Sequence, residues 1–239
     1  MRISFTLGIL CAALPLFTLA SGCRSGDGGG RKTVQVESQV PLGTYDQGKL
    51  QQASGEYLKA VASYRQAIAC SPDPLERDLA KIGAAECLLA LKKYPAALAA
   101  LEPLPLQVVL ETDALKLALA GESLLHQNRY EEAEVYLEIA LNSLDLESFA
   151  QTAQEGSLTS APAWVAPAAA NLGCACLKND KPEEAMVMYQ FSAMMYRANG
   201  NTIEANKSEG MYNDLASVIR QYAPHKPIPV VKGGHPGKF

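Results

Sequence analysis

Histidine and tryptophan are scarce in this chain of 239 residues, which holds 3 histidines and 1 tryptophan. The sequence contains no HExxH, GxSxG or Walker motif, and no group of cysteines and histidines has zinc-site spacing. Basic residues are not in excess either, since the formal net charge is −4, so nothing marks the chain as a nucleic-acid binder. These absences predict a protein with no catalytic residues, no metal and no cofactor.

The 6 cysteines include no CxxC pair. Cys174 and Cys176 stand two apart on a predicted helix, so they point about 200° apart and cannot easily bridge each other. Two interpretations stay open for the cysteines of the folded region. They are small buried apolar residues, or one disulfide involves Cys70 or Cys87.

The first residues have the pattern of a secretory signal. One positive charge at Arg2 precedes an apolar run over residues 3–20, and small residues follow. We therefore expect residues 1–22 to be a signal peptide. An uncleaved membrane helix is the alternative that Pro15 and the modest length of the run disfavour.

The run Ala20-Ser21-Gly22-Cys23 resembles the lipobox of bacterial lipoproteins, although leucine is commoner where Ala20 stands. The resemblance implies that Cys23 becomes the acylated first residue and the lipid anchor, because more than one acyl chain, such as palmitate, anchors a protein stably. An ordinary cleaved signal remains the alternative. Arg24 after the cysteine implies, by the sorting rule of enteric bacteria, the outer membrane facing the periplasm. Residues 23–40 would form the tether.

Residues 120–141 have the pattern of two short amphipathic helices joined by a polar turn. The second helix places apolar or small residues at spacings of three and four, with glutamates on its other face. A hairpin this short cannot bury its apolar face alone, so it needs copies on either side.

Copies of this hairpin are found by anchoring on one small residue in each first helix. The four anchors are Gly48, Ala85, Gly121 and Gly173, at spacings of 37, 36 and 52. An alanine follows each anchor twelve positions on, and a large residue follows sixteen positions on, namely Tyr64, Leu101, Leu137 and Tyr189. We expect the small residues to let paired helices approach closely while the large residue fills the gap between them.

This pattern resembles the tetratricopeptide repeat family, whose repeat has 34 residues. Leu172-Gly173, the run Gly55-Glu56-Tyr57-Leu58-Lys59-Ala60 and the closing Pro72 carry the resemblance, which covers residues 41–197. It implies an all-α fold, a right-handed superhelix of about four helical hairpins plus a C-terminal capping helix, over residues 41–222. It implies little about function, because such repeats serve many unrelated partners.

The expected elements follow from this register. Hairpins are predicted at residues 44–53 with 56–70, 75–92 with 95–101, 106–126 with 130–142, and 163–179 with 182–197. Within 106–126 we favour a short lead-in and a helix capped at Thr112 or Asp113 over one long helix. Residues 145–163 are an insertion. Asn201 with Glu204 resembles a capping box that opens a last helix over 202–222, with a polar outer face. A proline-rich tail over residues 223–239 is either disordered or an extended strap, and a partner could bind it.

Trp164 and the methionines each have two interpretations. Trp164 packs the insertion onto the fourth hairpin, or it contacts a partner. The methionines of the fourth hairpin, Met186, Met188, Met194 and Met195, fill the core or line an adaptable binding surface.

In the family, the first helices of the hairpins line a concave groove. The equivalent residues here are Tyr45, Lys49, Gln52, Ile82, Glu86, Leu89, Glu122, Leu125, His126, Cys174, Leu177 and Lys178. The basic clamp of chaperone-binding members is not reproduced, since Glu86 and Glu122 would repel a C-terminal carboxylate. We expect an extended or helical peptide ligand with some basic character.

Three hypotheses about function follow. The first is a lipid-anchored scaffold that holds a protein or peptide partner at the cell envelope. The second is a dedicated non-catalytic subunit of one envelope complex for assembly, secretion or pilus formation. The third, for which no polar cluster speaks, is an enzyme or a solute-binding lipoprotein.

Overall fold

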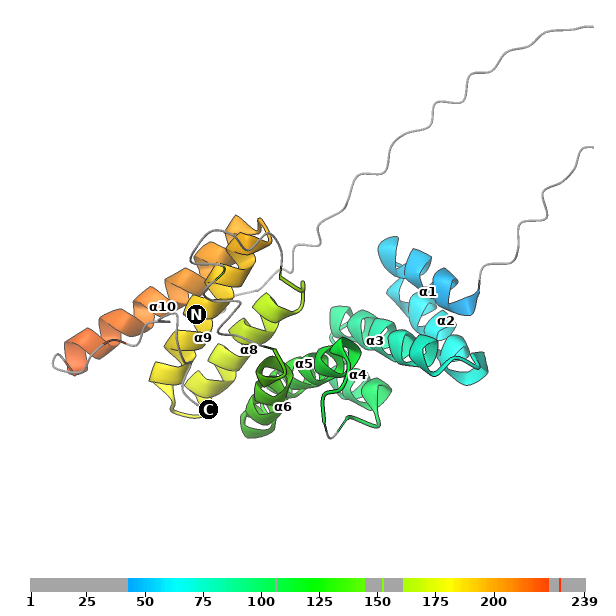
Figure 1. The fold of residues 1–239 in the computed structure, drawn as a ribbon, viewed down its shortest axis with the longest axis horizontal. Helices are drawn as coiled ribbons and strands as arrows, with labels where there is room; N and C mark the ends of the chain where they lie inside the picture. Colours follow the sequence, from blue (N-terminus) through cyan, green and yellow to red (C-terminus); the bar gives the residue numbers. More distant parts are fainter. Residues whose placement is uncertain (1–42, 106, 145–151, 153–160, 224–227, 229–239) are drawn as a thin grey trace, which may run out of the picture. The chain divides into compact units, whose positions relative to one another are not determined.

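The computed structural model describes residues 43–105, 107–144, 152, 161–223 and 228, all within the unit Val40–Phe239. The predicted signal peptide, Cys23, the tether, most of the insertion and most of the tail lie outside the described residues. The regular elements of the described part are α-helices (Figure 1). They are α1 (Thr44–Ala53), α2 (Tyr57–Cys70), α3 (Pro74–Ala90), α4 (Tyr94–Leu101), α5 (Glu111–His126), α6 (Tyr130–Asn142), α8 (Val165–Lys178), α9 (Pro182–Ala198) and α10 (Thr202–Tyr222).

Consecutive helices pack against each other, which confirms an all-α fold built from helical hairpins. The paired helices are α1 with α2, α3 with α4, α5 with α6, and α8 with α9. Each second helix also packs on the next first helix, and the first helices touch in the series α1, α3, α5, α8. The helix that follows the fourth hairpin, α10, packs on α9.

The two helices of each hairpin are joined by the same backbone turn. The residue seven positions after each anchor has a positive φ: Gly55 at 77°, Lys92 at 58°, Asn128 at 60° and Asp180 at 58°. The next amide donates back across the turn in every hairpin, for example from Arg129 to the Leu124 carbonyl at 3.0 Å. This left-handed cap satisfies carbonyls that the end of the first helix leaves without partners.

The predicted fit of small and large residues between paired helices is confirmed at three anchors. A methyl group on Gly121 would lie 2.5 Å from Cγ of Leu137, and one on Gly48 would lie 2.7 Å from the ring of Tyr64. Gly173 approaches the ring of Tyr189 in the same way, with 3.2 Å to such a methyl group. The glycines therefore set how closely each pair of helices packs.

Cores on both sides of α5 bury most of the remaining apolar residues. Met186, Met188 and Met195 are buried, as the core interpretation predicts. Trp164 packs against the larger core, and its indole nitrogen donates to Oε1 of Glu111 at 3.4 Å. These contacts favour packing over partner contact for Trp164.

The cysteines of the described part are free. Cys87 and Cys176 are buried, as expected for small apolar residues, and burial raises the pKa of each thiol to about 12. Cys70 is exposed and Cys174 is half-buried.

Two local predictions need correction. The N-cap of α5 is Leu110, so neither Thr112 nor Asp113 caps it. Asp113 instead reaches back to accept from the amides of Leu110 at 3.0 Å and Val109 at 3.1 Å, which satisfies donors just before the helix.

The outer face of α10 is not purely polar. Among its exposed residues are apolar side chains in addition to the predicted Lys207, Asn213, Asp214 and Arg220. The predicted cap at its start is present, since Oδ1 of Asn201 accepts from the amide of Glu204 at 3.2 Å. In the part of the chain that the structure describes, no helix combines the length and apolar character that a membrane crossing requires.

Candidate protein-binding face

Two glutamates on neighbouring first helices carry the negative charge of the predicted groove. Glu86 lies on α3 and Glu122 on α5, and both side chains are half-buried. Burial is the main cause that raises the pKa of each carboxyl group above 4.5, and the charge of Glu86 raises that of Glu122 further. Within the described residues, no hydrogen bond or ion pair offsets the charge of Glu122.

A chain of hydrogen bonds from the first hairpin holds Glu86. The hydroxyl of Tyr64 donates to Oε1 of Gln52 at 2.7 Å, and Nε2 of Gln52 donates to Oε2 of Glu86 at 2.8 Å. The Gln52 bond opposes the effect of burial on the pKa of Glu86. The carboxylate is therefore fixed in position without being neutralised.

Tyr45 and Lys49 of α1 lie beside this chain. The rings of Tyr45 and Tyr64 are tilted at 50° with centroids 5.9 Å apart, and the ammonium of Lys49 lies 5.6 Å from the centroid of Tyr45. Burial and then the charge of Asp46 raise the pKa of Tyr45, and the charge of Glu86 adds to the effect. Tyr45, Gln52, Glu86 and Glu122 thus form one electrostatic neighbourhood.

The apolar residues predicted for the groove divide between core and surface. Ile82 is buried, so it does not face solvent. Leu89 and Leu125 are half-buried and pack against the cores. His126 is exposed and stacks on Tyr94 with 4.4 Å between ring centroids. Partial loss of hydration of the imidazole and then the charge of Lys92 lower its pKa.

The fourth hairpin contributes differently. A hydrogen bond links the half-buried thiol of Cys174 to Tyr189 of α9, which directs the thiol to its own hairpin. Leu177 packs against the larger core, and Lys178 is exposed. The acidic part of the face therefore belongs to the second and third hairpins, with support from the first.

Tyr196 of α9 lies within electrostatic range of Glu122, and no spacing pattern in the sequence pointed to it. Burial raises its pKa to about 12, and the charges of Glu204 and Glu122 contribute. We call the group Tyr45, Lys49, Gln52, Glu86, Glu122 and Tyr196 the first-helix face, since the first helices supply most of it.

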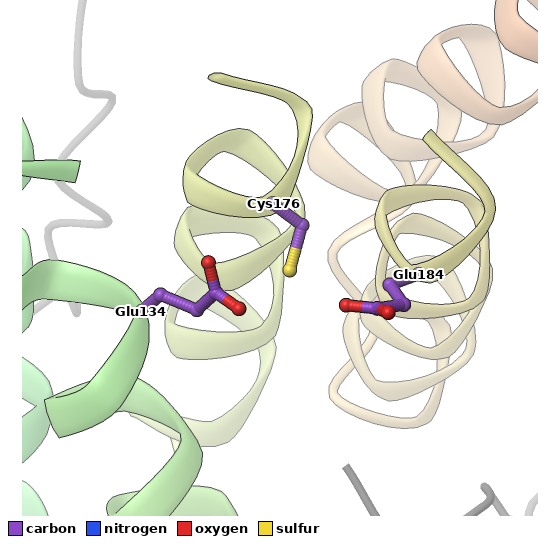
Figure 2. A group of neighbouring side chains, drawn as sticks. All are labelled: Glu134, Cys176 and Glu184. Carbon is purple, nitrogen blue, oxygen red and sulfur yellow. The ribbon is translucent and has the colours of Figure 1, made fainter. Parts of the chain in front are cut away.

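A second acidic group lies on the second-helix side, where Glu134, Cys176 and Glu184 have ligand atoms within 4.8 Å of one another. Figure 2 shows these three side chains converging from α6, α8 and α9. The ammonium of Lys181 pairs with Glu134 and lies 3.9 Å from Glu184, and the amide of Asn179 also donates to Glu134. Lys181 supplies a cation to this group, which joins the third hairpin to the fourth.

The first-helix face can attract a cation and bury apolar surface, but it holds no pairing of nucleophile and base. Its acids are spaced along two helices, which suits a partner with positive charges along an extended or helical segment. A scan against protein-family models finds no match for this chain, and a search of curated proteins finds none.

Proposed function

We propose that this protein is a lipid-anchored, non-catalytic scaffold of the bacterial cell envelope that binds a protein or peptide partner through its first-helix face. The observation that carries the proposal is the pair Glu86 and Glu122. Both carboxylates lose hydration through burial, and neither gains a cation from the described residues. A lysine or arginine of a partner would supply that cation.

The proposal includes a tetratricopeptide-type superhelix with α10 as its capping helix. The recurrent left-handed turn, the glycine contacts and the series of touching first helices support it. A superhelix of this type would align the first helices along one groove.

Affinity capture from crosslinked membranes tests the binding role. Glu86→Gln together with Glu122→Gln should lower capture of the main partner about tenfold, the effect of roughly 1.4 kcal/mol. The matched control is Glu102→Gln together with Glu131→Gln, which removes the same charge from exposed positions outside the face. Equal losses in both variants would contradict the assignment of the face.

The same capture separates the two non-catalytic alternatives. A scaffold yields several partners in sub-stoichiometric amounts, whereas a dedicated subunit of one envelope complex yields a single stoichiometric partner.

The anchor is tested separately. Cys23→Ser should abolish acyl labelling and release the protein from membranes. A variant that stays labelled and membrane-bound would refute the lipobox interpretation while leaving the binding face untouched.

A further inference from the structure

The last helix carries an apolar stripe that the rest of the described protein leaves open. Met211, Val218 and Tyr222 of α10 are 38%, 51% and 78% exposed, respectively. They are seven and four residues apart, so they lie on one side of the helix. The buried side of α10, with Ala205, Ala216 and Ile219, lies about a third of a turn from this stripe, and α10 packs on α9.

The chain beyond α10 returns to this same helix. Ile228 packs against the small cluster formed by Met186, Ala216 and Ile219. Because α10 ends at Tyr222, the chain must reverse direction to bring Ile228 back beside Ala216, about 9 Å before the helix end.

The remaining chain is long enough to run from Ala216 past Met211 to the start of α10. Residues 229–239 span about 36 Å when extended. The helix from Ala216 back to its start at Thr202 is only about 21 Å long. Four prolines in residues 223–239 disfavour a helix and favour an extended segment, which costs less entropy to dock.

The chemistry of this segment also matches the stripe. Pro229, Val230 and Val231 follow Ile228, and Lys232 comes next. Asp214, which is exposed, lies within one turn of both Met211 and Val218 and would meet a lysine there. Residues 223–239 contain no aspartate or glutamate that would oppose this pairing.

We propose that residues 229–239 fold back along α10 toward Thr202 and cover Met211, the residue of the apolar stripe that lies on their path from Ala216. The tail takes the place that another hairpin would fill in a longer array, and it closes the open end of the helical stack. Covalent attachment gives the segment a local concentration in the millimolar range, which favours it over a free partner of equal affinity.

Photocrosslinking in the full chain tests the proposal. Benzoylphenylalanine replaces Met211, and a control chain carries it at Asn213, which points about 200° away on the same helix. From position 211 we expect an adduct at monomer mass that joins tryptic peptide 208–220 to residues 229–232 of peptide 221–232. From position 213 the yield should be at least five times lower.

Substitutions in the tail sharpen the test. In the chain with the crosslinker at position 211, Val230→Asp with Val231→Asp should lower the adduct at least fivefold, whereas His235→Asn should leave it unchanged. Circular dichroism checks that every variant keeps its helix content.

Absence of the monomer adduct from a folded chain would overturn the proposal. A crosslinked dimer would assign the stripe to a second copy, and an adduct with another protein would assign it to a partner; each of these results would also overturn it.

Discussion

The two acidic groups of this protein have similar chemistry and opposite surroundings. At Glu134 and Glu184, Lys181 and Asn179 come from the turn between α8 and α9 and satisfy the charge. At Glu86 and Glu122, only the neutral amide of Gln52 approaches among the described residues. The first group ties the third hairpin to the fourth, whereas the second has no cation among the described residues. An acidic cluster is therefore interpreted by its counter-charges and not by its carboxylates alone.

Removing Lys181, the cation that pairs with Glu134, should have the largest effect on the free energy of unfolding. Lys181→Met leaves the Glu134 side chain, which is 7% exposed, with a charge and only the Asn179 amide as partner. Breaking a pair whose acid is buried costs several kcal/mol, and the 45% exposure of Lys181 reduces this to about 2 kcal/mol. Urea unfolding measures the loss.

Lys207→Met is the matched control, because it breaks the more exposed pair with Glu204 on α10. Its effect should stay below about 0.5 kcal/mol. Equal losses would mean that the bridge to Glu134 is no stronger than a surface pair.

Removing Gln52, whose amide orients Glu86, should have a smaller effect on the free energy of unfolding. Gln52→Leu deletes the donor to Glu86 and the acceptor of the Tyr64 hydroxyl, at a cost of about 1 kcal/mol. Since the Gln52 bond lowers the pKa of Glu86 against burial, that pKa should rise in the variant. Carboxyl NMR titration measures the pKa. In Tyr64→Phe it should rise less, because the donor to Glu86 remains.

Replacing Glu122 by a neutral residue should stabilise the fold slightly. The raised pKa of Glu122 means that the folded state holds the proton more tightly than the unfolded state. Stability of the natural chain therefore falls as pH rises from below 4.5 through the raised folded pKa. Glu122→Gln removes this loss, so at pH 7 the variant should be more stable by about 0.5 kcal/mol.

The pH profile provides the check on Glu122→Gln. Denaturant unfolding of the variant and the natural chain should coincide at about pH 3, where the carboxyl is protonated in both states. At pH 7, Glu134→Gln should destabilise instead, because it weakens charge-assisted bonds from Lys181 and Asn179. The same sign for both variants would erase the contrast between the groups.

Added metal should have the smallest effect. With Lys181 in place, Mn²⁺ should leave the melting temperature unchanged within scatter, because an ion that does not bind the folded state cannot stabilise it. A rise that depends on Mn²⁺ concentration and disappears in Glu134→Gln would show that the ion displaces Lys181.

Several elements were predictable because they depend on local patterns. The bounds of α1, α6 and α10 match the expected ranges, and the anchors Gly48, Gly121 and Gly173 meet their large partners as the offsets required. The turns were less visible, because Lys92 and Asp180 adopt a left-handed conformation that glycine usually provides. Hydrogen bonding within the turn determines that conformation, and residue type alone does not reveal it.

The first-helix face was predictable only in outline. The register placed Tyr45, Lys49, Glu86 and Glu122 in the groove along the first helices. It also placed Ile82 in this groove, but the side chain of Ile82 is buried in the core. The bonds from Tyr64 to Gln52 and on to Glu86 join positions 12 and 34 residues apart, and Tyr196 of α9 lies within electrostatic range of Glu122. No periodicity encodes which side chains of different hairpins meet.

The amino-acid sequence alone determined that this chain folds into repeated helical pairs, because spacing of small and apolar residues is a local property that each hairpin carries in itself. Only the tertiary structure decided which charges are satisfied. Whether Lys181 reaches Glu134, and whether any cation reaches Glu122, depends on how one hairpin is rotated against the next, and that rotation results from packing along the whole stack.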